Sequence, residues 1–290
     1  MKNANGRDGE SMRLQITLTS AEGKKIIALA VKADKAVQRV LRKGRVVLKG
    51  GTTTSAIAEE LSGKPMKISG IITPKGTLTC GFKDEIHLPH SLILFRGQII
   101  PLDSPEDWAK ETPFLTPEDL VITGANAFDA YGHAAVMAAR YAGGSSLPSF
   151  QTLLIEGIPF LITVGLEKML PGNLWDIIPL AGRKRVDLSY GASVGLIPIF
   201  GRIFTEVEAL QTLAKVKVSV IGKGGILGAE GSSTFLVDGP KNEVLQIDRI
   251  YQSVKGVGLS ALPRNLIPCF RGCSSCKTHM KCLFKRGLRK

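Results

Sequence analysis

Short apolar runs alternate with segments of helical spacing along most of this 290-residue chain, and the alternation leaves few folds open. The clearest unit is RVVLKGGTTTSAIAEEL at residues 45–61, in which a β-branched apolar run, a glycine pair with three threonines and a helical pattern follow one another. Strands that alternate with helices predict an α/β fold, with a mostly parallel sheet covered by helices on both faces. In such a sheet, ligands bind at the carboxyl ends of the strands.

The same patterns recur along the chain and divide it into three parts. Further strands are predicted in the segments 11–20, 91–100, 119–124, 159–165, 217–222 and 233–239. Helical spacing predicts a long helix over 20–44 and later helices over 130–142, 166–178 and 241–256. We therefore expect an N-terminal extension (1–19), an α/β ligand-binding domain (20–262) and a basic, cysteine-rich tail (263–290).

Composition excludes several classes of protein. With 44% hydrophobic residues the chain can bury a large core, and its apolar runs are too short and too interrupted to span a bilayer. The first ten residues, MKNANGRDGE, lack the apolar core of a signal peptide, which predicts a cytoplasmic protein. The formal net charge of +13 lies at the two ends of the chain. Nucleic acid, anionic lipid or an acidic partner would suit these ends, and so would ordinary solvated lysines.

A loop with the chemistry of an anion site follows the strand of the first unit. Gly50 and Gly51 let the backbone approach a ligand, and the three threonines at 52–54 bring hydroxyl groups to the start of a helix. The alternative is a plain glycine turn with a threonine N-cap. The loop is neither a Walker loop nor a GxGxxG motif.

The first unit resembles the first strand, loop and helix of the superfamily of ribose-5-phosphate isomerases, sugar-phosphate-responsive repressors and coenzyme A transferases. VITGANAFD at 121–129 is similar to the second landmark of that superfamily, and VGLEKMLP at 164–171 resembles its lactate-utilisation branch, whose members join this fold to iron-sulfur elements. The resemblance implies a site for phosphate or a portion of coenzyme A. Its residues would be Gly50, Gly51, Thr52, Thr53, Thr54, Gly124, Ala125, Asn126, Glu167 and Lys168.

The chain departs from the isomerase pattern where that pattern needs carboxylates for proton transfer. The corresponding positions are Thr123 and Asn126, and neither side chain can act as a base. Asp129 lies close by in the sequence, and Glu230 lies in GAEGS, where a transferase would keep a glutamate that becomes acylated. A surface or capping role is the alternative for both carboxylates, so the sequence leaves open whether any reaction is catalysed.

For the remaining polar residues, the sequence predicts mainly structural roles. His87 and His90 flank a proline in HLPH, and the segment is interpreted as a turn because no third zinc ligand lies nearby. His133 is predicted to open the helix over 130–142, either facing a bound anion or packing at the helix start. Cys80 is interpreted as a small buried residue.

Four of the five cysteines lie in CFRGCSSCKTHMKC, close to the end of the chain. Such bunching indicates a metal site rather than a disulfide framework. Four thiolates in so short a run favour a [4Fe–4S] cluster, and zinc, held by four thiolates or by three with His279, is the main alternative. The three-residue and two-residue gaps also match radical S-adenosylmethionine enzymes, but a fourth cysteine would close the iron position that the nucleotide needs. The predicted ligands are Cys269, Cys273, Cys276 and Cys282.

Two functional hypotheses follow from these motifs. The first is an iron-sulfur protein whose α/β domain binds an anionic metabolite and whose cluster senses redox state or passes electrons to a partner protein. The second is a non-catalytic ligand sensor or assembly subunit, in which a zinc knob with basic residues docks a partner protein or nucleic acid. Both hypotheses leave open the identity of the ligand and the association of copies of the chain with one another.

Overall fold

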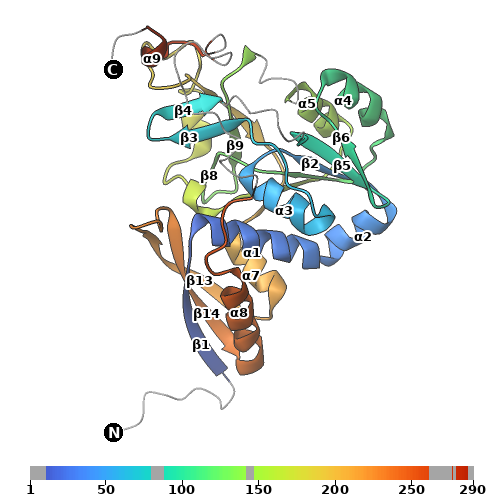
Figure 1. Cartoon of the computed structure of the whole chain (residues 1–290), viewed down its shortest axis with the longest axis vertical. Coiled ribbons are helices and arrows are strands. Elements are labelled where there is room, and N and C mark those ends of the chain that lie inside the picture. Colours follow the sequence, from blue (N-terminus) through green and yellow to red (C-terminus); the bar gives the residue numbers. More distant parts are fainter. Residues whose placement is uncertain (1–10, 80–87, 142–146, 261–275, 277–278, 287–290) are drawn as a thin grey trace.

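A mixed six-stranded sheet forms the centre of the molecule, in a computed structural model that describes residues 11–79, 88–141, 147–260, 276 and 279–286 (Figure 1). The strand order is β12-β10-β7-β2-β5-β6; the first four strands are parallel, and β5 and β6 are antiparallel to their neighbours. The α/β class and the mainly parallel central sheet are therefore confirmed. The strands are β2 (Val46–Lys49), β5 (Ser91–Phe95), β6 (Gln98–Pro101), β7 (Leu120–Thr123), β10 (Phe160–Thr163) and β12 (Arg202–Phe204).

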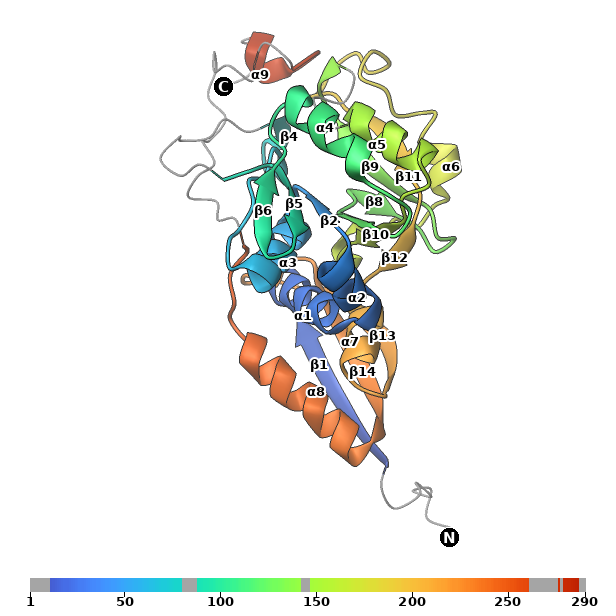
Figure 2. The same ribbon diagram turned by 90° about the vertical axis from the view of Figure 1, so that its right-hand side faces the viewer.

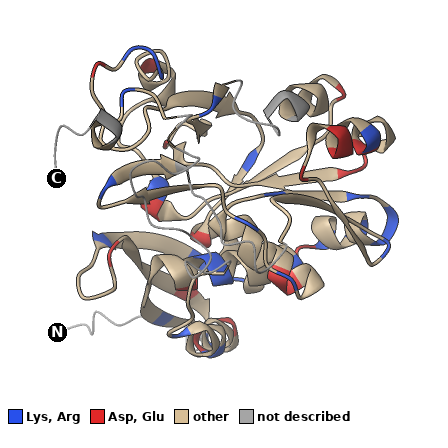
Figure 3. Ribbon diagram, turned by 45° about the horizontal axis from the view of Figure 1, so that its top comes forward, with Lys and Arg blue, Asp and Glu red and all other residues tan. Residues whose placement is uncertain are grey.

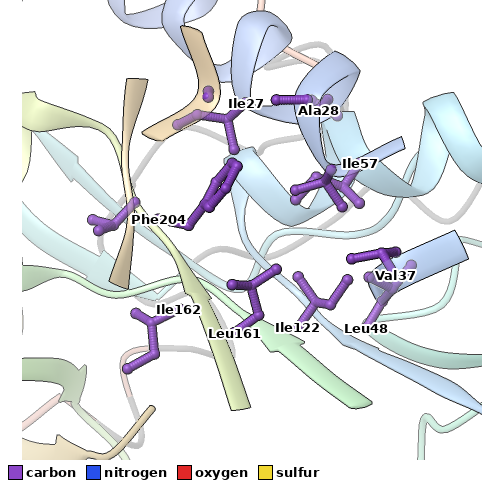
Figure 4. Close-up of a cluster of buried hydrophobic side chains, with 14 of the residues drawn as sticks. Ile27, Ala28, Val37, Leu48, Ile57, Ile122, Leu161, Ile162 and Phe204 are labelled. Atoms are coloured by element: carbon purple, nitrogen blue, oxygen red, sulfur yellow. The ribbon is translucent and has the colours of Figure 1, made fainter. Parts of the chain in front are cut away.

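Helices lie on both faces of this sheet. Figures 1 and 2 place α1, α2 and α3 on one side of the strands and α4 and α5 on the other. Figure 4 shows Ile27 of α1 near Phe204, and Ile57 of α3 above the strands that carry Leu48 and Ile122. All five side chains are buried, because each helix packs its apolar stripe against the apolar side chains of the strands. The helices are α1 (Ser20–Ala33), α2 (Lys35–Lys43), α3 (Thr52–Ser62), α4 (Pro105–Glu111) and α5 (Leu147–Ile155), and a 3-10 turn, η1 (Thr112–Phe114), follows α4.

The prediction of one long helix over 20–44 is wrong in one respect: the helix is interrupted at Asp34. This residue has extended backbone angles, with ψ 123°, and its carboxylate accepts hydrogen bonds from the amides of Ala36 (2.8 Å) and Val37 (3.1 Å). Asp34 thus ends α1 and caps α2. An aspartate favours such a cap over a helix interior because its short side chain satisfies the free amides of a new first turn.

A second, antiparallel sheet packs beside the first and joins the two ends of the described domain. The strand expected near the N-terminus, β1, pairs along its length with β14, and β14 pairs with β13. Figure 2 shows α8 lying along this sheet. The elements are β1 (Ser11–Leu18), α7 (Glu206–Leu213), β13 (Lys217–Gly224), β14 (Ser232–Pro240) and α8 (Lys241–Val254).

The helix predicted over 130–142 is wrong: Ala134–Ala138 forms strand β9, which pairs with β8 (Ala127–Phe128) and β11 (Gly195–Ile199). An apolar run this short fits the period of a helix as well as that of a strand, and the pairing with β11 decides its structure. His133 therefore lies in a turn before a strand and does not open a helix.

Two other elements differ from their predictions. The helix expected over 166–178 is reduced to a 3-10 turn, η3 (Leu166–Lys168), and a short helix, α6 (Leu174–Ile177), with Pro171 between them. The segment 91–100 is not one strand but the hairpin of β5 and β6, whose turn residues Arg96 and Gly97 both have positive φ. The remaining elements are the hairpin strands β3 (Gly70–Thr73) and β4 (Gly76–Thr79), and α9 (Leu283–Arg286).

Candidate ligand site at the carboxyl edge of the sheet

The three loops singled out in the sequence meet at one edge of the central sheet. Strands β2, β7 and β10 are parallel neighbours, so the loops that follow them leave the same edge, which we call the carboxyl edge. These loops hold the segments 50–54, 124–126 and 166–168. Lys168 Nζ donates to the carbonyl oxygen of Ala125 at 2.9 Å, so a hydrogen bond joins the second and third loops.

The helix that follows the first loop begins without a side-chain cap. The N-cap residue of α3 is Gly51, so the alternative of a threonine N-cap does not hold. Thr54 Oγ1 donates to the Gly51 carbonyl oxygen at 3.0 Å. Thr53 is 1% exposed, and its hydroxyl group has no hydrogen-bond partner in the described part of the chain. At this helix N-terminus, where an anion is stabilised, the first-turn amides thus have no side-chain cap and a buried hydroxyl group has no partner among the described residues.

Lys49, the last residue of β2, brings a cation next to this loop. Its Nζ lies 3.9 Å from the centre of the Phe150 ring, and no carboxylate of the described chain pairs with it. Burial lowers the pKa of Lys49 to about 8. Gly50 packs against His90, where a Cβ atom would overlap the imidazole ring, which explains the glycine.

His90 itself plays a structural part in a loop, as the sequence indicated. Its Nδ1 lies 3.1 Å from the Lys67 carbonyl oxygen, and its backbone amide donates to Asp103. Burial lowers the pKa of His90. His87 lies outside the described residues, as does Cys80.

Two buried charged residues that the sequence did not single out complete the carboxyl edge. Lys24 of α1 forms an ion pair with Glu167 at 2.6 Å and is 5% exposed. Glu206, the first residue of α7, is 4% exposed, and its Oε2 accepts a hydrogen bond from the Leu166 amide at 2.9 Å. Figure 3 shows acidic and basic segments side by side in this middle region of the molecule. We call Lys24, Glu167, Lys168 and Glu206 the charged cluster.

Burial and mutual charge set the protonation of the charged cluster. Burial, followed by the charge of Glu167, raises the pKa of Glu206 to about 7. Burial, followed by the charge of Lys24, lowers the pKa of Lys168 to about 8. For Glu167, burial acts to raise the pKa, but the charges of Lys24 and Lys168 outweigh it and the pKa is lowered. Below pH 7 the cluster therefore holds two ammonium groups, one carboxylate and one neutral carboxyl group, a net charge of one positive unit.

The charged cluster also contains an unused acceptor. Glu167 Oε1 binds Lys24, whereas Glu167 Oε2 is buried and has no hydrogen-bond partner among the described residues. Gly231, in the loop between β13 and β14, lies against the Glu167 side chain, and the Lys223 ammonium group donates to the Leu166 carbonyl oxygen. The loop after β13 thus covers part of this edge.

Several predicted residues serve the fold rather than the ligand. Asn126 Oδ1 accepts a hydrogen bond from the Met137 amide at 2.9 Å, and the Thr123 hydroxyl group donates to the neighbouring carbonyl oxygen at 3.2 Å. The Asp129 carboxylate is buried and binds backbone amides. Glu230 is exposed, with its carboxylate on the Gly228 amide, as the capping alternative predicted.

Two of the four tail cysteines fall within the described residues. Cys282 is buried, and the backbone around it pairs with Ser189: the Ser189 amide donates to the Lys281 carbonyl oxygen (3.1 Å), and the Leu283 amide donates to the Ser189 carbonyl oxygen (2.9 Å). Cys276 is half-buried, and neither cysteine is in a disulfide. Among the described residues, no three His, Cys, Asp or Glu side chains gather as a metal site. Cys269 and Cys273 lie outside the described residues, so the four-cysteine site stays a prediction.

Comparisons with protein-family models, with curated proteins and with solved structures found no match. Within the described chain, no helix is both long enough and apolar enough to cross a membrane. Any functional assignment therefore depends on the chemistry of the residues described above.

Proposed function

We propose that the carboxyl edge binds an anionic metabolite of the phosphate or coenzyme A type. The observation that carries this proposal is the N-terminus of α3, where first-turn amides without a side-chain cap meet the buried hydroxyl group of Thr53, which no described residue partners. Lys49, a cation without a carboxylate partner in the described chain, lies at the end of the strand that leads into this turn. Amides, a hydroxyl group and an ammonium group are the donors that a phosphate oxygen accepts from.

The charged cluster would bind a second part of the same ligand. Its net positive charge below pH 7 favours an anion, and the unpartnered oxygen of Glu167 favours a ligand with a hydrogen-bond donor. Glu206 and Lys168 have pKa values of about 7 and about 8, which suits proton transfer near neutral pH. The cysteine tail would add a [4Fe–4S] cluster with a redox role.

Replacing Thr53 with valine is expected to abolish most of the thermal stabilisation that inorganic phosphate or coenzyme A gives to the wild-type protein. Valine keeps the shape of threonine and removes the hydroxyl group, so the fold should persist while the ligand loses a donor. A thermal-shift titration with each ligand measures the effect. Thr212→Val, on the exposed side of α7, serves as the control and should respond as the wild type does. Equal stabilisation in wild type and Thr53→Val would remove Thr53 from the site.

We also expect no interconversion of ribose 5-phosphate and ribulose 5-phosphate by the purified protein. Thr123 and Asn126 stand where the isomerase pattern has carboxylates, and both side chains are engaged with the backbone. A coupled assay for ribulose 5-phosphate measures the activity. Turnover that disappears in Glu206→Gln would contradict this expectation and would identify Glu206 as a base.

A further inference from the structure

Four aromatic rings from three separate segments form a row on the surface. The ring centroids of Tyr131 and His133 are 6.3 Å apart, those of His133 and Trp175 are 4.7 Å apart, and those of Trp175 and Phe200 are 6.0 Å apart. Tyr131 is 70% exposed, Phe200 55% and Trp175 41%. We call these four residues the aromatic row. So many exposed rings in one place mark a binding surface rather than a misplaced core.

One buried carboxylate holds the row in place. Asp129 Oδ2 accepts hydrogen bonds from His133 Nδ1 and from the Leu174 amide, each at 2.8 Å, so it ties the turn before β9 to the start of α6. Its Oδ1 accepts from the amides of Tyr131 and His133, each at 2.9 Å. Burial acts to raise the pKa of Asp129, but these hydrogen bonds outweigh it and lower the pKa to about 2, so the carboxylate stays ionised at neutral pH.

This arrangement fixes the His133 ring and the backbone that carries Tyr131 and Trp175. The contact with Asp129 occupies His133 Nδ1 and leaves Nε2 as the nitrogen available to a ligand. Asn173 caps α6 through the Trp175 amide at 2.9 Å, which fixes the backbone below the indole. Rings on a backbone that is already held in place lose less conformational freedom on binding, which favours the affinity of stacked partners.

A basic loop follows the segment that carries Trp175. It holds the half-buried Arg183 and the exposed Lys184 and Arg185, and the Arg185 guanidinium donates to the carbonyl oxygen of Pro179, shortly after the end of α6. Arg202, two residues beyond Phe200, is 57% exposed but already forms an ion pair with Asp34 at 3.4 Å. Asp176, exposed next to Trp175, and Asp187, exposed two residues after Arg185, oppose the attraction of a polyanion to this loop.

We propose that the aromatic row binds single-stranded nucleic acid, with bases stacked on Tyr131, Trp175 and Phe200 and phosphates held by the basic loop at 183–185. Exposed rings beside cations are the combination that binds single strands without strong sequence preference. A duplex keeps its bases stacked on one another and would have only its phosphates to offer to this surface. The proposal is independent of the metabolite site at the carboxyl edge.

Tryptophan fluorescence tests the proposal in the intact protein. Of the two tryptophans, Trp108 is 3% exposed and Trp175 is 41% exposed, so base stacking should quench the emission of Trp175 alone. We expect a thymidine dodecamer to quench the emission of Trp175 at low salt, and the affinity to fall as salt is raised. A duplex of the same length should bind far more weakly.

Variants assign the binding to the row when a labelled dodecamer is followed by fluorescence anisotropy. Tyr131→Ala and Phe200→Ala should each weaken binding by ~5- to 150-fold, the cost of one stacked base. Tyr141→Ala, a ring that is 88% exposed outside the row, is the matched control and should leave the affinity unchanged. Asp176→Asn should strengthen binding, because it removes an opposing charge.

Specific results would overturn the proposal. These are an absence of binding at low salt, an equal affinity for duplex and single strand, or an affinity that is the same in the wild type and in both alanine variants. Self-association or capture of a partner protein that the alanine variants abolish, without nucleic-acid binding, would assign the row to a protein interface instead. Far-ultraviolet circular dichroism of each variant separates lost binding from lost folding.

Discussion

Replacing Glu206 with glutamine is expected to raise the free energy of unfolding by about 3 kcal/mol at pH 8 and to change it little at pH 4. The pKa of Glu206 is raised in the folded protein from 4.5 to about 7. Folding therefore favours the protonated carboxyl group, and the wild type loses stability as the pH rises from about 4.5 to about 7. Glutamine is neutral at every pH and can still accept the Leu166 amide, so the variant avoids this loss.

Urea unfolding at several pH values measures the difference. Glu118→Gln, at an exposed position, is the control and should follow the pH dependence of the wild type.

Glu206→Gln also tests the ligand site. Because ionised Glu206 removes the net positive charge of the charged cluster, wild-type affinity for phosphate or coenzyme A should fall above pH 7, and Glu206→Gln should keep it. Parallel stability curves for wild type and Glu206→Gln would show that Glu206 ionises freely in the folded protein.

Changing Cys273 or Cys276 to serine is expected to remove most of the bound iron, together with the broad visible absorption band, from protein purified without oxygen. If four thiolates share one cluster, each is bonded to iron, and the loss of one ligand releases the cluster. Cys80→Ser is the matched control, because Cys80 lies outside the cysteine run and should not affect the metal content. Iron, sulfide and zinc analyses accompany the spectra.

Other outcomes of this experiment have distinct meanings. A colourless wild-type protein with one zinc per chain would support the alternative of a zinc knob. Full iron in Cys276→Ser would contradict the shared cluster. Cys282→Ser adds a check, because Cys282 is buried beside Ser189: a stable fold without iron identifies a ligand, and a destabilised fold with iron identifies a packing residue.

The contacts of the last described segment bear on how the tail is ordered. From the sequence we expect metal removal to make the chain after Pro268 sensitive to protease, because so short a segment has few apolar residues of its own. The backbone hydrogen bonds between Ser189 and residues 281–283 anchor the end of this segment to the loop that holds Ser189. Protection of the segment 279–286 in metal-free protein would show that this anchor suffices.

Local sequence patterns predicted those strands and helices whose formation depends mainly on residues close by in the sequence. The unit at 45–61 forms β2 and α3 as expected, because its β-branched run, its glycine pair and its helical spacing each act within a few residues. The helix α8 and the strands β7, β10, β13 and β14 also follow from such patterns. Parallel order then places the three predicted loops at one edge, because strands of one direction end on the same side.

Tertiary structure alone decided the rest. The segment at 134–138 is a strand because β11, far along the chain, offers it a partner, whereas its own apolar run fits either period. Lys24 and Glu206 look like ordinary helix residues in the sequence, and burial against Glu167 and Lys168 gives Glu206 its raised pKa. The aromatic row likewise combines three segments that Asp129 and the strand pairing bring together. Local sequence specifies backbone preference, but the energies of burial, charge and stacking depend on neighbours that only the folded chain supplies.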